Sequence, residues 1–119
     1  MVTHYVPPIT VTSQRLILDN EKLRRANAKV STRTTYKYGD LLTLSDANVL
    51  THATDESTWD VICGQDVTAG AADGIEIPVY YGGVFNVEAV SLDGALLDTA
   101  QYDAARAKAT KNKIELSKV

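Results

Sequence analysis

The sequence predicts an α+β fold: a small β-rich domain with a partly closed sheet, one helix near the C-terminus and a final strand after it. Residues 75–90, IEIPVYYGGVFNVEAV, hold two alternating apolar runs around a Gly-Gly pair, a pattern typical of β-structure. Residues 98–112 begin with a helix-capping pattern and continue with apolar residues at helical spacing. Residues 1–14 contain Pro7-Pro8 and no helical pattern, which indicates an extended arm. We therefore expect an extended N-terminal arm, residues 1–14, and a single domain, residues 15–119.

The stretch at residues 75–90 predicts a β-hairpin. A three-residue turn at residues 81–83 would place Val79 opposite Phe85 and keep the apolar side chains of both strands on one face. A glycine would then occupy the left-handed position that such a turn requires. We expect Phe85 to be buried on the apolar face of this hairpin and the hairpin itself to act as scaffold.

Shorter β-branched and apolar runs predict further strands along the chain. The boundaries follow from Gly, Asp, Asn and Ser residues, which favour turns. Residues 20–29, NEKLRRANAK, fit either a helical turn or a loop, and residues 45–58 are polar enough to predict a loop. Strands are expected at residues 15–19, 31–38, 41–44 and 59–64, with a turn of small residues at 68–74.

The C-terminal segment predicts a helix followed by a strand. Asp98 is a candidate N-cap, and Gln101 stands three residues later, as in a capping box. Lys and Arg gather toward the end of the helix, where they suit its dipole, and Asn112 can end it. Residues 113–119 alternate as a strand. The expected apolar residues are Tyr102, Ala105 and Ala109 on the helix and Ile114 and Leu116 on the strand.

Charge is distributed unevenly along the 119 residues. Residues 1–37 carry a net charge of +5, residues 38–105 contain twelve acidic residues and no Lys or Arg, and residues 106–119 carry +4. One interpretation is chance combined with solubility. The other is electrostatic complementarity, in which basic ends meet the acidic middle of another copy or of a larger partner. On the second interpretation, Arg24 and Arg25 are candidates for contacts with another subunit or with that larger partner.

The sequence contains few groups suited to catalysis. His4 stands in the arm, His52 in a polar stretch, and Cys63 lies within an apolar run, where a buried small hydrophobe is more common than a nucleophile. None of the usual motifs of metal, acyl-transfer or phosphate-binding sites occurs. We expect no enzyme activity, cofactor, metal or small-molecule substrate. The longest apolar run is too short for a membrane span, and the single cysteine suits synthesis in a reducing cytoplasm.

Residues 39–119 resemble the head decoration proteins of tailed phages, the lambda type. The similarity lies in the order GDLLTLSDANVLT, then TWDVICGQDVTAGAADGIEIPVYYGGVFNVEAV, then a capped helix and the closing strand IELSKV. Its most specific piece is GIEIPVYYGGVFNVEAV, read as an apolar strand, a Gly turn and a Phe-x-apolar-Glu strand. In residues 12–37 the chain departs from that family, because a basic, Thr-rich segment replaces a Gly/Ala/Pro-rich one.

The resemblance implies a structural role in a virion. Proteins of that family bind the outside of an expanded capsid, typically as trimers, and clamp the coat subunits against the pressure of packaged DNA. It implies the major capsid protein and a homotrimer as partners, no nucleic acid or membrane partner, and synthesis in the cytoplasm of a bacterial host. The arm would order on the coat protein, which suits the affinity that an extended segment gains from main-chain hydrogen bonds. The expected coat-protein contacts are Tyr5, Val6, Pro7, Pro8, Ile9 and Val11.

Two other classes of protein remain open from the sequence. A different virion component, of the tail-tube or connector type, would also be β-rich and without catalytic groups, and it would assemble into rings or tubes. A small nucleic-acid-binding β-barrel would place Tyr80 and Tyr81 against bases, although the lack of basic residues between positions 38 and 105 argues against phosphate contacts there.

Overall fold

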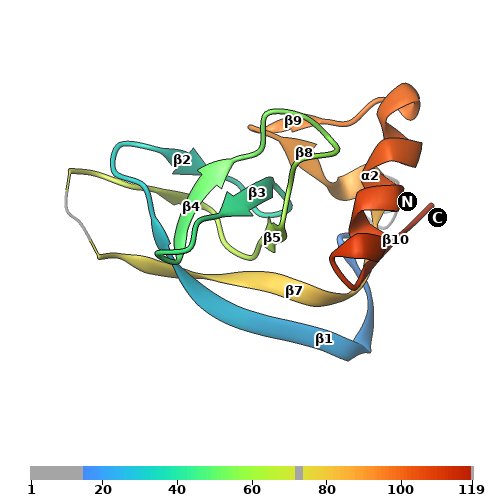
Figure 1. The fold of residues 1–119 in the computed structure, drawn as a ribbon, viewed down its shortest axis with the longest axis horizontal. Helices are drawn as coiled ribbons and strands as arrows, with labels where there is room; N and C mark the ends of the chain where they lie inside the picture. Colours follow the sequence, from blue (N-terminus) through green and yellow to red (C-terminus); the bar gives the residue numbers. More distant parts are fainter. Residues whose placement is uncertain (1–14, 72–73, 119) are drawn as a thin grey trace, which may run out of the picture.

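The computed structural model describes residues 15–71 and 74–118. Within these residues the fold is β-rich, with a mixed sheet and one α-helix, so the predicted α+β class is confirmed. Figure 1 shows the two longest strands side by side along one side of the molecule and the helix at one end. The elements are β1 (Ile17–Val30), β2 (Thr35–Tyr36), β3 (Leu41–Leu44), β4 (Val49–His52), β5 (Val61–Cys63), β6 (Val67–Thr68), β7 (Glu76–Asn86), a 3₁₀ turn (Val87–Ala89), β8 (Ser91–Leu92), β9 (Ala95–Leu96), α2 (Thr99–Lys111) and β10 (Ile114–Ser117).

Five strands of the main sheet close into a ring. The sheet has the order β1-β4-β3-β5-β7-β10, and β1 also pairs with β7, which joins the first strand to the fifth. The β1–β4 and β7–β10 pairs are parallel, while the other pairs in this sheet are antiparallel. Closure leaves β1 and β7 with partners on both sides, and β10 extends the sheet from the C-terminal half of β7.

Both faces of the central strands are buried. One cluster of buried side chains comes from all five strands of the ring, including Ala28 of β1, Leu50 of β4 and Val79 of β7. The second cluster joins the other face of β3, β5 and β7 to α2 and β10 and includes Trp59 and Phe85, both fully buried. Side chains of successive strand residues point to opposite faces, so a strand covered on both sides can be apolar throughout, as β5 is.

The predicted hairpin at residues 75–90 is wrong, because β7 runs unbroken through the Gly-Gly pair. The glycines permit a close approach of β1 instead of a turn. A Cβ atom on Gly82 would lie 3.1 Å from Cγ of Arg24, and one on Gly83 would lie 3.3 Å from Cα of Leu23. The expected pairing of Val79 with Phe85 is therefore absent, and these two side chains belong to different core clusters.

The segment before residue 31 is also more regular than expected. The predicted strand at residues 15–19 and the helical turn or loop at 20–29 are replaced by β1, which pairs with β7 from Ile17 opposite Phe85 to Lys29 opposite Glu76. Register shifts interrupt the pairing in three places. The largest shift lies between Asp19, opposite Val84, and Arg24, opposite Gly82, where β1 advances by more residues than β7. Pairing with β7 thus overrides the weak β-propensity of these residues.

The strands after β1 differ from expectation in length more than in place. The strands predicted at 41–44 and 59–64 are confirmed as β3 and the shorter β5. The strand predicted at 31–38 shrinks to β2, and β6 overlaps the turn expected at 68–74 only at Thr68. The loop expected at 45–58 contains β4, whose Leu50 is fully buried. A two-residue apolar step, Val49-Leu50, in a polar stretch is too short to signal a strand by itself.

The C-terminal elements are as predicted. Asp98 and Gln101 form a reciprocal capping box at the start of α2, and Asn112 ends the helix. Ala105 and Ala109 are fully buried against the second core cluster. In β10 the side chains of Ile114 and Leu116 are buried and that of Glu115 is exposed, as the alternation predicts.

Candidate functional site

The arm residues proposed to contact coat protein, Tyr5, Val6, Pro7, Pro8, Ile9 and Val11, lie outside the described residues, as does His4. The described chain begins at the end of the sheet. Leu16 is buried, and its carbonyl oxygen accepts a hydrogen bond of 2.8 Å from the backbone N–H of Asn86. Ile17 then pairs with Phe85 at the C-terminal end of β7. The arm is thus joined to the body at a backbone position held by the core.

Arg24 and Arg25 are both exposed on β1, but they do not form a single patch. Arg24 lies across from Gly82, and a register shift separates it from Arg25, which lies across from Tyr80. The charge of Arg25 acts on the hydroxyl of Tyr38, whereas Arg24 lines a groove beside β7. The side chains of Arg24 and Arg25 therefore contribute charge to different surfaces of the protein.

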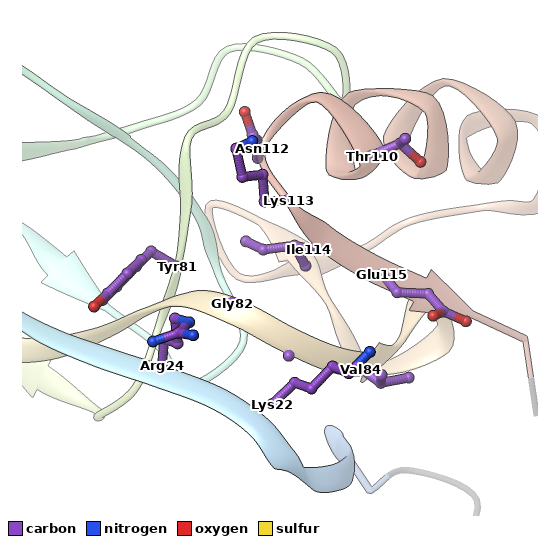
Figure 2. A pocket seen from close by; sticks show the side chains of 11 residues that line it. Lys22, Arg24, Tyr81, Gly82, Val84, Thr110, Asn112, Lys113, Ile114 and Glu115 are labelled. Atoms are coloured by element: carbon purple, nitrogen blue, oxygen red, sulfur yellow. The ribbon is translucent and has the colours of Figure 1, made fainter.

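This groove, which we call the basic groove, has a volume of about 990 Å³ and lies between β1 and β10. Figure 2 shows Lys22 and Arg24 on the β1 side and the start of β10 on the other, with β7 between them. Gly82 and Gly83 form part of its floor, and the side chain of Arg24 packs close to Gly82. The lining residues are Lys22, Arg24, Tyr81, Gly82, Gly83, Val84, Thr110, Asn112, Lys113, Ile114 and Glu115.

The electrostatics of the basic groove favour an anionic ligand or partner. Lys22, Arg24 and Lys113 line it, against Glu115 as the one acidic lining residue. All four side chains belong to exposed residues, so their charges remain screened by solvent. The ring of Tyr81, which is 45% exposed, adds an apolar and stacking surface at one side. The sequence revealed the basic segments but not that the chain's two basic ends meet across β7.

Tyr80 of β7 contacts a second tyrosine, Tyr38. The rings of Tyr38 and Tyr80 meet edge to face with their centroids 6.4 Å apart. Partial burial, followed by the proximity and hydrogen bonding of Tyr80, raises the pKa of Tyr38 to about 12, although Arg25 acts in the opposite direction. The Tyr38 hydroxyl therefore stays protonated at neutral pH, and it is not a base.

A buried carboxylate, which composition and spacing did not reveal, ties the β8–β9 hairpin to the ring. The side chain of Asp40 is fully buried. Its Oδ1 accepts hydrogen bonds from the hydroxyl of Ser91 and from the backbone N–H of Gly94 at 3.0 Å. Its Oδ2 accepts from the backbone N–H of Lys37 at 2.9 Å. Three donors from two separate segments thus compensate for burying this charge.

His52 lies beside this carboxylate, on β4 and not in the loop predicted from the sequence. Its Nε2 is 2.7 Å from the carbonyl oxygen of Thr35, which makes it the donor, and 3.4 Å from Oδ1 of Asp93. Its Nδ1 is 3.8 Å from Oδ2 of Asp40, too far for a hydrogen bond. Because Ser91 donates to Asp40 and not to His52, the group lacks the serine–imidazole contact of a nucleophilic site.

Cys63 is fully buried and packs in the cluster inside the ring. Burial raises the pKa of its thiol to about 11, and the nearby charges of Asp40 and Asp66 act in the same direction. The thiol is therefore neutral at physiological pH, as expected for a small buried hydrophobe. Across residues 15–71 and 74–118, no three His, Cys, Asp or Glu side chains are grouped so that they could hold a metal ion.

The helix of the described region is not long and apolar enough to cross a membrane. A comparison with protein-family models finds no match for this chain, and a search of curated proteins finds no significant relative.

Proposed function

We propose that this chain is a viral structural protein that binds the outer surface of an expanded phage capsid and stabilises it against the pressure of packaged DNA. The proposal rests on the resemblance of residues 39–119 to lambda-type head decoration proteins. The observation that supports it is the order of elements after Gly39, in which the strands β3, β5 and β7 come before α2 and β10. The turn that the resemblance implies at the Gly-Gly pair is absent, because β7 runs from Glu76 to Asn86 and a 3₁₀ turn follows it, so the order of elements is the support that remains.

In this proposal the arm, residues 1–14, clamps the coat protein. The support is the firm attachment of the arm at Leu16, whose backbone is bonded to Asn86 and whose side chain is buried. A load on the arm would therefore be carried directly by β7, the central strand of the sheet, which pairs with β1, β5 and β10. The proposed contacts remain Tyr5, Val6, Pro7, Pro8, Ile9 and Val11.

The proposed partners are the major capsid protein and further copies of the chain, as a homotrimer on the outside of the virion. Three copies would turn weak individual contacts into high avidity, provided that their arms reach coat subunits at the same time. The separation of charge along the sequence supports contacts between copies, because the groove gathers basic residues while residues 38–105 supply only acidic ones.

Co-sedimentation with capsids of the encoding phage tests the proposal. We expect the full chain to pellet with expanded capsids and much less with unexpanded ones. A chain lacking residues 1–14 should remain folded, because the described core begins at Leu16, and it should bind expanded capsids at least ~10-fold more weakly because it has lost its main-chain and apolar anchors. Unchanged affinity of the truncated chain would contradict the role of the arm. Failure of the full chain to bind either form of capsid would refute the proposed function.

A further inference from the structure

We propose that the basic groove is the docking site for the β8–β9 hairpin of a second copy of this chain. The inference takes from the proposed function only that copies of the chain associate. It adds which two surfaces meet and which residues decide the contact.

The acceptor surface combines three cations with an apolar floor. Lys22 and Arg24 lie on β1 and Lys113 lies just before β10, on opposite sides of the glycine floor of β7 (Figure 2). The volume of about 990 Å³ lies at the upper end of the ~300–1,000 Å³ of small-molecule pockets, which is room for a turn of peptide. The side chain of Arg24 packs against Gly82, so a partner that enters the groove meets this side chain beside the glycine floor.

The donor surface is a tight hairpin with complementary chemistry. Asp93 and Gly94 form its turn with positive φ angles of 49° and 86°. The side chain of Asp93 is 77% exposed, and Leu96, at 57%, is the most exposed large hydrophobic residue of the described chain. Asp98 follows at the helix N-cap, and no Lys or Arg occurs between positions 38 and 105. The basic group nearest the turn is the imidazole of His52, whose Nε2 lies 3.4 Å from Oδ1 of Asp93. An exposed leucine between two carboxylates fits an apolar groove edged by cations.

The hairpin cannot enter the groove of its own chain. Asp40 holds it to the ring through Ser91 and Gly94, and a backbone hydrogen bond of 3.1 Å joins Ser91 to Gly39. Figure 1 shows β8 and β9 on the side of the molecule away from β1 and β7. Donor and acceptor are therefore different surfaces on different sides, which makes the contact heterologous. Such a contact produces a closed ring or an open filament according to the rotation between copies.

A matched pair of substitutions on β1 tests the acceptor surface. Arg24→Glu and Arg25→Glu change the same charge at adjacent exposed positions, but only Arg24 lines the groove. Sedimentation equilibrium in ~0.02 M salt should show self-association weakened roughly 10-fold by Arg24→Glu and changed less than about 2-fold by Arg25→Glu. The difference should shrink in ~1 M salt. Leu96→Asp on the donor surface should weaken association at both salt concentrations, because it replaces an apolar contact.

A charge exchange identifies the partner surface. Asp93→Lys alone should weaken association, and the combination of Asp93→Lys with Arg24→Glu should recover most of the lost affinity, because opposite charges again face each other. The circular dichroism spectrum of each variant shows whether it is folded, which distinguishes a folding defect from a binding defect. A wild-type chain that remains monomeric at its highest soluble concentration would overturn the inference, as would equal effects of the two arginine changes or absence of recovery.

Two further measurements separate this inference from its alternatives. If a single-stranded oligonucleotide binds the wild type and Arg24→Glu abolishes that binding while leaving self-association intact, the groove serves nucleic acid and the inference fails. Capsid co-sedimentation of the same variants reports on the proposed function independently. Association through the groove without capsid binding would refute only the proposed function, whereas capsid binding by a monomer would refute only the inference.

Discussion

Replacing Asp40 by alanine should destabilise the domain by about 3 kcal/mol, since it leaves three hydrogen-bond donors without their acceptor. The donors are the backbone N–H groups of Lys37 and Gly94 and the hydroxyl of Ser91. Each partly buried donor left unpaired costs about 1 kcal/mol, at the low end of the usual range because water can reach the two backbone groups. The resulting loss is a large fraction of the ~5–15 kcal/mol typical of a folded domain.

Two milder variants calibrate this estimate. Asp40→Asn keeps the size of the side chain but presents an NH₂ group to one donor, so we expect a loss of about 1–2 kcal/mol. Ser91→Ala removes a single donor and should cost about 1 kcal/mol. Urea unfolding followed by the fluorescence of Trp59, the only tryptophan and fully buried, measures all three. The reasoning is refuted if Asp40→Ala loses less than Ser91→Ala, or if Asp40→Asn is the least stable of the set.

Three further variants test the core and the closure of the ring. Phe85→Ala should lower the free energy of unfolding by about 3–5 kcal/mol, because the ring is fully buried, and a loss below about 1 kcal/mol would contradict its place in the core. Gly83→Ala should cost about 1–3 kcal/mol, since φ is +131° and Cα of Leu23 would lie 3.3 Å from the new Cβ, whereas Gly70→Ala, with no neighbour within 4 Å, should stay within about 0.5 kcal/mol. The Cys63 thiol, with a folded pKa of about 11 against ~8.5 in an unfolded chain, should stay protonated longer in the folded state, so stability falls as pH rises between these values. Urea unfolding at pH ~8 and ~10 should show a smaller decrease for Cys63→Ala than for the wild type, and an equal decrease would contradict the burial of the thiol.

Local signals in the sequence were sufficient for the C-terminal part of the fold. The capping box at Asp98 and the alternation of Ile114 and Leu116 depend on neighbours within a few residues, and both were predicted. The Gly-Gly pair of β7 misled the prediction for the opposite reason. A glycine pair permits a turn and also permits another strand to approach, and only the position of Leu23 and Arg24 decides between them.

The candidate site was even less accessible from the sequence. The basic groove brings together Lys22 and Arg24 with Lys113, about ninety positions apart along the chain, because β1 and β10 both border β7. The Asp40–Ser91 contact likewise joins residues 51 positions apart. Composition shows that the two ends of the sequence are basic. It does not show that these charges lie beside one another, because that depends on the pairing of β1 and β10 with β7.

The pairing of β1 with β7 also determines when the protein can fold. The Ile17–Phe85 pair can form only after Phe85 has left the ribosome. Until β7 has been synthesised, no strand is present to pair with β1 and close the ring. Until then β1 presents an unpaired edge of up to fourteen residues, which could pair with another nascent chain. Contacts between such distant residues slow folding, because the entropy of closing the intervening segment is lost before the contacts form. The polar and charged side chains of residues 19–25 oppose aggregation at that edge during the interval.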